Sequence, residues 1–402
     1  MSHLAGWPVR DKSSKFRRAV LPLGENETGQ AMESFSMGHA SGHDWCSAVD
    51  ACAAQLEPLP AGANLGFVYV TDTLAGELDK ITATLVQRTG IADWVGATGV
   101  GICATGREYF GEPAIAAMAG CFPVGSFKLF DDVGDDLAGF IAEHREWLDE
   151  SEAHFAVVHA DPRNPRTAEL IPALAEAADC FLVGGLVSSR GVYAQVAGRL
   201  SQSPVSGVMF HAEVPVATAL TQGCSPIGPV HEITMSRDNL VYQLDGRQAL
   251  EVFKEDIGEE LAADLHGIGQ HIFAGFPLRG SDRADYTVRN LLGIDMNTGI
   301  IAIAAEIEDG QEVMFCRRDR EAATADLDRM LADLKRRTDG PARGAVYFTC
   351  LGRGPNIFGE QSAELCQIQR EIGDVPLVGF FCNGEISHNR LYGYTGVLSL
   401  FL

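Results

Sequence analysis

Two charged residues near the C-terminus have the chemistry to bind a small molecule. Arg353 lies between two glycines just after an apolar run at residues 344–349, and Glu385 directly follows Gly384. A guanidinium can hold a carboxylate or a phosphate through two parallel hydrogen bonds, and a carboxylate can receive a ligand amine or pair with the arginine. An arginine in a surface turn and a carboxylate at a strand end are equally good interpretations of these residues.

A similarity between two parts of the chain indicates which elements position these residues. The runs at residues 66–71 and 344–349 are each followed by a helical pattern, an apolar run ending in Val-Gly, a glycine five positions later and a last apolar run. Such a unit predicts two parallel strands joined by a right-handed helical crossover. A partial third copy begins at residues 155–160 and reaches Gly184 and Gly185, with a different spacing to the next glycine.

Ligands on parallel sheets bind beyond the carboxyl ends of the strands, so the loops after the two strands should converge there. Glycine in these loops permits a positive φ or a close approach of a ligand, although tight turning alone would explain it. Thr98 and Asn383 add neutral hydrogen-bonding groups, with turn capping as the alternative. The candidate ligand-binding residues are Arg353, Glu385, Asn383, Gly379, Gly384, Gly96, Thr98, Gly101, Gly184 and Gly185.

These patterns predict an α/β protein with two related lobes, built from repeated strand–helix–strand–glycine loop–strand units. Because the clear helical patterns are amphipathic, we expect the sheets to pack face to face with the helices outside. We expect a loose arm over residues 1–35, one lobe over residues 36–225 and a second over residues 226–402. The segment at residues 223–229 is rich in turn formers and should join the lobes.

Composition excludes several classes of partner. The chain has 402 residues and a net charge of −23, which repels phosphate backbones and anionic lipid, so neither nucleic acid nor a membrane surface is expected to bind. No segment has the apolar length of a spanning helix or of a signal peptide, which predicts a cytoplasmic protein. Ten cysteines without CxxC pairs are typical of reduced, mostly buried thiols.

Single residues suggest other site chemistries. His39, His43 and Cys46 share a helical spacing, but no fourth metal ligand lies nearby in the sequence, so no metal is expected. Residues 99–104 match a dinucleotide-binding pattern without the helix and the acidic residue that such a site needs, so nucleotide binding there is rejected.

Two further chemistries involve cysteine and histidine. Cys350 and Cys382 fall on the converging loops and, with His388 as base, would suit a thiol-dependent enzyme, although buried structural cysteines are commoner. Haem would need an axial ligand. The candidates for that ligand are His159, His211, His231 and His271.

Four segments, taken in order, resemble a known family. They are residues 223–228, residues 288–295 with 299–303, residues 350–354 and residues 379–386. These segments are similar to the paired FIST N and FIST C domains, named for F-box and intracellular signal transduction. The resemblance implies a sensory module for small ligands, with amino acids or related metabolites as the proposed class. It also implies that haem is possible, because some bacterial members are described as haem-binding sensors of nitric oxide.

The resemblance points to a bacterial stand-alone form. The first 35 residues are too short for the F-box of eukaryotic relatives, and no output domain is fused, so the signal should pass to a separate signalling protein. We therefore expect a cytoplasmic sensory protein that binds a small molecule and is not an enzyme, with no cofactor. The alternatives are a haem-binding nitric oxide sensor and, behind it, a thiol-dependent enzyme.

Overall fold

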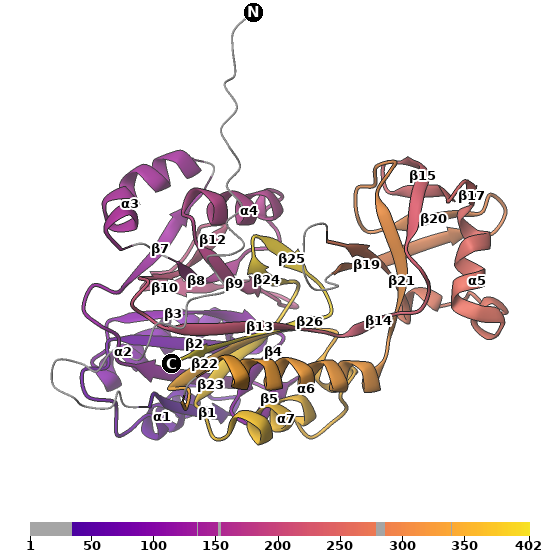
Figure 1. Cartoon of the computed structure of the whole chain (residues 1–402). Helices are drawn as coiled ribbons and strands as arrows, with labels where there is room; N and C mark the ends of the chain where they lie inside the picture. Colours follow the sequence, from indigo (N-terminus) through magenta and orange to yellow (C-terminus); the bar gives the residue numbers. More distant parts are fainter. Residues whose placement is uncertain (1–33, 135, 152–153, 279–285, 339) are drawn as a thin grey trace, which may run out of the picture.

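The computed structural model describes residues 34–402, apart from residues 135, 152–153, 279–285 and 339 (Figure 1). In these residues a core of three six-stranded sheets stands beside a smaller domain of antiparallel strands. The arm predicted over residues 1–35 lies outside the described residues except for its last two. In the described part of the chain, no helix is long and apolar enough to cross a membrane.

One arrangement of elements occurs three times in the described core. Each unit begins with an edge strand, which is followed by a helix, directly in the first two units and after an insertion in the third. Two parallel strands joined by a second helix come next. A short hairpin and a strand antiparallel to the first of the parallel pair complete the unit. The first unit consists of β1 (Ser36–Ser41), α1 (Trp45–Gln55), β2 (Leu65–Thr71), α2 (Leu78–Thr89), β3 (Asp93–Gly99), β4 (Gly101–Ala104), β5 (Arg107–Phe110) and β6 (Ala114–Gly120). The second consists of β7 (Phe127–Val133), α3 (Leu137–Ser151), β8 (Phe155–Ala160), α4 (Thr167–Ala177), β9 (Phe181–Leu186), β10 (Gln195–Ala197), β11 (Arg199–Leu200) and β12 (Val205–Phe210).

The third unit follows the same order with an insertion after its edge strand. It consists of β13 (Val216–Gln222), α6 (Arg320–Arg337), β22 (Gly344–Cys350), α7 (Ala363–Ile372), β23 (Leu377–Cys382), β24 (Glu385–His388), β25 (Arg390–Tyr392) and β26 (Thr395–Phe401). The predicted α/β class and repeated unit are confirmed, and the partial third copy at residues 155–185 belongs to a complete unit.

Each hairpin leaves its own unit and completes the sheet of another. The β4–β5 hairpin pairs with β23 of the third unit, β10–β11 pairs with β3 of the first, and β24–β25 pairs with β9 of the second. All three pairings are antiparallel and use the free edge of the second parallel strand. The described units therefore form a closed ring, in which each sheet includes a hairpin from another unit.

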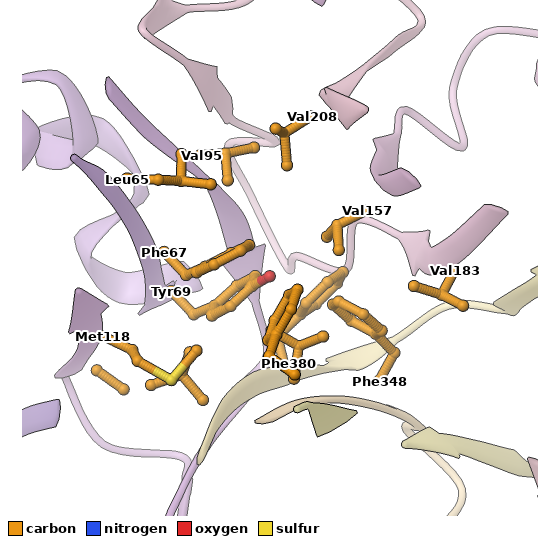
Figure 2. Close-up of a cluster of buried hydrophobic side chains, with 14 of the residues drawn as sticks. Leu65, Phe67, Tyr69, Val95, Met118, Val157, Val183, Val208, Phe348 and Phe380 are labelled. Carbon is orange, nitrogen blue, oxygen red and sulfur yellow. The ribbon is translucent and has the colours of Figure 1, made fainter. Parts of the chain in front are cut away.

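The inner faces of the three sheets bury a common aromatic core. The rings of Tyr69, His159 and Phe348, one from each unit, have centroid separations of 5.5, 6.2 and 6.3 Å. Phe380 stacks on Tyr69 at 5.4 Å (Figure 2). The outer faces pack against α1 and α2, against α3 and α4, and against α6 and α7 in separate clusters. Face-to-face sheets with helices outside are therefore confirmed.

A glycine on the second parallel strand lies against the backbone of the first in each unit. A Cβ on any of these glycines would lie 1.7 or 1.8 Å from a carbonyl oxygen of the partner strand. The pairs are Gly96 with Val68, Gly184 with Val158, and Gly379 with Tyr347.

These pairs correct the alignment of the two similar sequence runs by one residue. The sequence similarity matches Tyr69 with Tyr347, whereas the strand register makes Phe348 the equivalent of Tyr69. Because side chains alternate along a strand, a shift of one residue exchanges the two faces. Tyr69 accordingly lies in the central core, and Tyr347 lies in the cluster beneath α6 and α7.

The smaller domain is inserted between β13 and α6. Its elements are β14 (Cys224–Pro226), β15 (His231–Arg237), β16 (Leu240–Leu244), β17 (Arg247–Gln248), α5 (Ala249–Ala262), β18 (Ile272–Pro277), β19 (Tyr286–Asp295), β20 (Ile300–Ile303) and β21 (Glu312–Arg318). Six of these described strands close into a barrel, because β18 pairs with both β19 and β21. The expected boundary at residue 225 lies in β14, where the chain enters the barrel, and residues 320–402 return to the third sheet.

A buried histidine ties β15 to α5. Nδ1 of His231 lies 2.6 Å from Asp245 Oδ2, and its Nε2 lies 2.8 Å from Asp256 Oδ2. Burial alone would lower the pKa of His231, but the hydrogen bonds and charges of the two carboxylates outweigh burial and raise it. The same contact lowers the pKa of Asp245.

We expect Gly96→Ala and Gly379→Ala each to destabilise the protein by about 3 kcal/mol or more, at the upper end for overpacking, because the obstructing atom belongs to the backbone. Gly42→Ala is the matched control, since its Cβ would meet no atom within 4 Å. Urea unfolding measures the three variants. Equal stability of Gly42→Ala and Gly379→Ala would contradict the prediction.

We expect His231→Gln to cost more stability at about pH 6 than at about pH 9. A histidine whose pKa is raised by folding contributes stability that is complete below its unfolded pKa of roughly 6.5, and that is lost as the pH rises through its folded pKa. Urea unfolding of wild type and variant at both pH values provides the measurement. A difference that does not change with pH would show that the charge of His231 is unimportant.

Candidate ligand-binding site

Arg353 is held by a carboxylate that the sequence did not single out. The chain turns after β22, where the Arg353 N–H donates to the Cys350 carbonyl at 2.8 Å, and the side chain of Arg353 is fully buried. Its Nη2 lies 2.7 Å from Oε1 of Glu364, and its Nε donates to the same oxygen at 2.8 Å. Burial opposes the charge on Arg353, but the Glu364 carboxylate outweighs burial and raises the pKa of Arg353.

Both carboxylate oxygens of Glu364 accept hydrogen bonds. It lies in the first turn of α7, a position where a carboxylate is favoured by the helix dipole. Its Oε1 accepts from the hydroxyl of Tyr347 at 2.6 Å, and its Oε2 accepts from the N–H of Gly354 at 2.9 Å. Glu364 is therefore the fixed counter-ion of Arg353.

Glu385 is the first residue of β24 and is also fully buried. Its Oε2 accepts from the N–H and the hydroxyl of Thr395 at 3.1 and 2.7 Å. Its Oε1 has no hydrogen-bond partner among the described residues. Burial raises the pKa of Glu385 to about 8, although the Thr395 hydrogen bonds, the charge of Arg353 and a weaker interaction with the Cys350 thiol act in the opposite direction.

A third carboxylate reaches this region through the exchanged hairpin of the first unit. Glu108 on β5 accepts from the Leu365 N–H at 3.3 Å through Oε1, while its Oε2 has no partner in the described structure. Burial, followed by the negative charge of Glu364, raises the pKa of Glu108 to about 8. Sequence reasoning missed both Glu108 and Glu364. A helix-start carboxylate is an ordinary surface feature, and no local pattern links β5 to a loop in another unit.

The Arg353 loop lies where the core meets the barrel. Nη1 of Arg353 has no hydrogen-bond partner among the described residues, and a Cβ on Gly223 would lie 3.3 Å from it. Gly223 lies between β13 and β14, so it belongs to the segment that leads into the barrel. The guanidinium also lies 4.9 Å from the centre of the Phe358 ring. The charge of Arg353 acts on Glu385, so these two buried side chains lie near one another; that they line a ligand pocket stays a prediction.

Most of the predicted glycines have a packing role. Those at the strand contacts were described above, and a Cβ on Gly185 would lie 2.2 Å from the sulfur of Cys382. A Cβ on Gly101 would lie 2.5 Å from Phe110, and Gly384 has a φ of 150°, a region that favours glycine.

In the described structure, the neutral residues Thr98 and Asn383 make no hydrogen bond to Arg353. The Thr98 hydroxyl hydrogen-bonds to both backbone groups of Ala194, and the side chain of Asn383 is exposed. Ligand contact at these glycines and neutral residues stays a prediction.

The thiol chemistry considered for the loops lacks an activated cysteine. Burial raises the pKa of both Cys350 and Cys382, whereas a nucleophilic thiol needs a lowered pKa. His388 stacks on Phe181 with ring centroids 5.2 Å apart. Within the described residues, no group of three or more histidine, cysteine or acidic side chains could hold a metal ion.

Two of the four histidines considered for haem, His159 and His231, have surroundings that do not fit an axial ligand. His159 is buried, its Nε2 is 3.1 Å from the Tyr69 hydroxyl, and burial lowers its pKa to about 3. The rings of the central core pack around it, so a porphyrin would have to displace them. Both ring nitrogens of His231 face carboxylates.

Comparison with known proteins identifies two matched regions. Residues 64–247 match the FIST N domain, and residues 249–388 match the FIST C domain. The two matches meet between β17 and α5, inside the barrel. FIST domains are associated with signal transduction and small-ligand sensing.

Related proteins occur in mycobacteria. An uncharacterized protein of Mycobacterium tuberculosis (strain H37Rv) is 28% identical over 373 residues, which cover 89% of this chain and 96% of the relative. An uncharacterized protein of Mycobacterium bovis is 34% identical over 191 residues, which cover 46% of this chain and 50% of the relative. With both domains matched in order across most of its length, the chain belongs to the FIST family.

Proposed function

We propose that this protein is a cytoplasmic sensor of a small molecule, and that the molecule binds between Arg353 and Glu385 at the junction of core and barrel. An anionic group of the ligand pairs with the arginine, and an amine pairs with the glutamate. An amino acid or a related metabolite carries both groups. The signal then passes to a separate protein.

A pair of unbonded polar atoms carries this proposal. Arg353 Nη1 and Glu385 Oε1 belong to fully buried side chains, yet neither atom has a hydrogen-bond partner in the described structure. Buried polar groups are almost always hydrogen-bonded, and an unpaired one costs about 1–3 kcal/mol. A ligand with one acceptor and one donor would satisfy both atoms.

The charge balance supports a ligand with a positive group. Among the described residues, the carboxylates of Glu108, Glu364 and Glu385 lie around the single guanidinium of Arg353. An ammonium group beside Glu385 would bring its raised pKa back towards the ordinary value. Ligand binding near neutral pH should therefore release a proton.

The position of the site suits a sensor. Ligand sites occur preferentially where domains meet, and here a fully buried site borders a segment that leads into a separate domain. A molecule that enters this site must displace its cover, so binding and the arrangement of the two domains should be linked. This link gives a separate partner protein a change that it could recognise.

Thermal unfolding in the presence of single amino acids tests the proposed ligand class, because a ligand that binds the folded state raises Tm by mass action. Each stabilising amino acid is compared with its N-acetyl and methyl ester derivatives, which lack the amine and the carboxylate charge. Loss of the effect in both derivatives supports binding at two points. If no amino acid stabilises the protein, while haemin binds stoichiometrically with a Soret band, the haem alternative replaces this proposal.

We expect Arg353→Ala to destabilise the protein by about 3–5 kcal/mol, because it leaves the Glu364 charge buried and unpaired. Arg353→Met combined with Glu364→Gln removes both charges. The amide oxygen can still accept from the Gly354 N–H, and the Tyr347 hydroxyl can accept from the amide N–H, so most of the stability should return. Ligand affinity should stay weaker by roughly 1.5–3 kcal/mol in the double variant. Arg353→Lys should restore little affinity, because a point charge cannot replace the planar fork.

Urea unfolding and isothermal titration calorimetry measure stability and affinity in these variants. Full affinity in the stable double variant would show that Arg353 is purely structural.

We expect Glu385→Gln to stabilise the ligand-free protein at neutral and alkaline pH. Folding raises the pKa of this carboxyl from 4.5 to about 8. Its contribution to stability is therefore favourable at low pH and falls by about 1.4 kcal/mol per pH unit between those values. The advantage of the variant should be small near pH 4, grow up to about pH 8 and then level off. The exposed carboxylate of Glu306 provides the control, and a flat difference for Glu385→Gln would contradict the prediction.

A further inference from the structure

The chain crosses between core and barrel twice, and residues at both crossings contact Arg353 or the loop that follows it. The first crossing contains Gly223, which lies against the guanidinium. The second leads from β21 into α6, where Arg320 donates through Nε to the Ile357 carbonyl at 3.0 Å and through Nη2 to the Phe358 carbonyl. Phe358 in turn supplies the ring that lies against Arg353.

Tyr394 connects the same site to the barrel directly. It lies between β25 and β26 in the core, yet its ring centroid is 4.4 Å from that of Phe273 on β18. Its hydroxyl donates to Oδ1 of Asn290 on β19 at 2.9 Å. On the other side, a Cβ on Gly352 would lie 2.9 Å from the ring, and a Cβ on Gly223 would lie 2.3 Å from the Tyr394 carbonyl oxygen.

The backbone of Tyr394 shows that its surroundings hold it in place. Its φ is +62°, a left-handed conformation that bulky side chains rarely adopt. Such a conformation persists only where neighbouring contacts determine it. The described contacts that do so come from the barrel, through Phe273 and Asn290, and from the Arg353 loop, through Gly352.

We propose that Tyr394 is a latch that closes the Arg353–Glu385 site beneath the barrel. While the Tyr394 ring packs against Phe273 and its hydroxyl bonds to Asn290, Tyr394 keeps the site closed. When these two contacts break, the loop that carries Arg353 becomes accessible and the barrel is released from the core on this side. The importance of the latch for sensing rests on the proposed function, whereas the latch itself can be tested without a ligand.

Cys350 provides a built-in reporter of opening. It ends β22 and is half-buried, its sulfur accepts from the Gly352 N–H at 3.4 Å, and its environment includes Glu385 and the backbone of Tyr394, so its labelling rate in the wild type is the baseline for the variants. Cys52 and Cys180 are buried in the outer clusters of the first and second units. They report general unfolding, because neither belongs to the junction.

The folded full chain is labelled with N-ethylmaleimide for increasing times and then digested. Mass spectrometry of the peptides gives the labelling rate of each cysteine. Asn290→Ala and Tyr394→Phe remove the same hydrogen bond from opposite sides. Each is expected to raise the labelling rate of Cys350 at least fivefold, without changing the rates of Cys52 and Cys180. The double variant should show no further increase, because both changes break one contact. Asn239→Ala is the matched control, since this barrel residue bonds within the barrel to the Ile303 carbonyl.

An unchanged Cys350 rate in both Asn290→Ala and Tyr394→Phe would overturn the latch. So would an equal increase in the Asn239→Ala control, since opening would then not depend on Tyr394. A faster Cys350 rate in the two latch variants supports the latch even if no amino acid stabilises the wild type. That combination would reject the proposed ligand class alone, so failure of the latch and failure of the proposed function are distinguishable.

Discussion

An open strand edge presents a row of unpaired backbone N–H and C=O groups, and each unit of the core leaves one edge of its second parallel strand open. The hairpin of another unit pairs with that edge in every described case. The same exchange positions the candidate site. It brings Glu108 from the first unit beside Glu364 of the third, and it places Glu385 against Gly185 of the second. The chemistry of one unit therefore depends on the other two being folded.

The site shows how a protein can bury several charges with only one cation. Arg353 has the carboxylate of Glu364 at ion-pair distance and the Phe358 ring beside it. Glu108 and Glu385 lack a cation of their own, and burial raises their pKa values into the neutral range. Near neutrality these two groups can exist as neutral acids at modest cost, because protonation avoids the penalty of an unpaired buried charge. The arrangement can therefore persist without a further cation beside these two carboxyl groups.

Local patterns predicted the α/β class, the parallel pairs and the convergence of Arg353 and Glu385, because each depends on residues close together in sequence. The register of the repeat was wrong by one position. The sequence alignment matched Tyr69 with Tyr347 because the residue types are the same. The correct register follows from the contact between Gly379 and the backbone of Tyr347, which only the structure shows. Glu364 was missed as the partner of Arg353 because an acidic residue at a helix start is common. The hairpin exchange that delivers Glu108 has no local signal, since it depends on pairing between distant strands.

The boundary between the two family matches divides the barrel. The two family matches meet between β17 and α5, so one contributes β15 and β16 to the barrel and the other contributes β18 to β21. The third core unit is divided in the same way, with β13 in one match and β22 in the other. The two domain names therefore describe stretches of sequence that fold together, because neither stretch alone contains a complete barrel or a complete third unit.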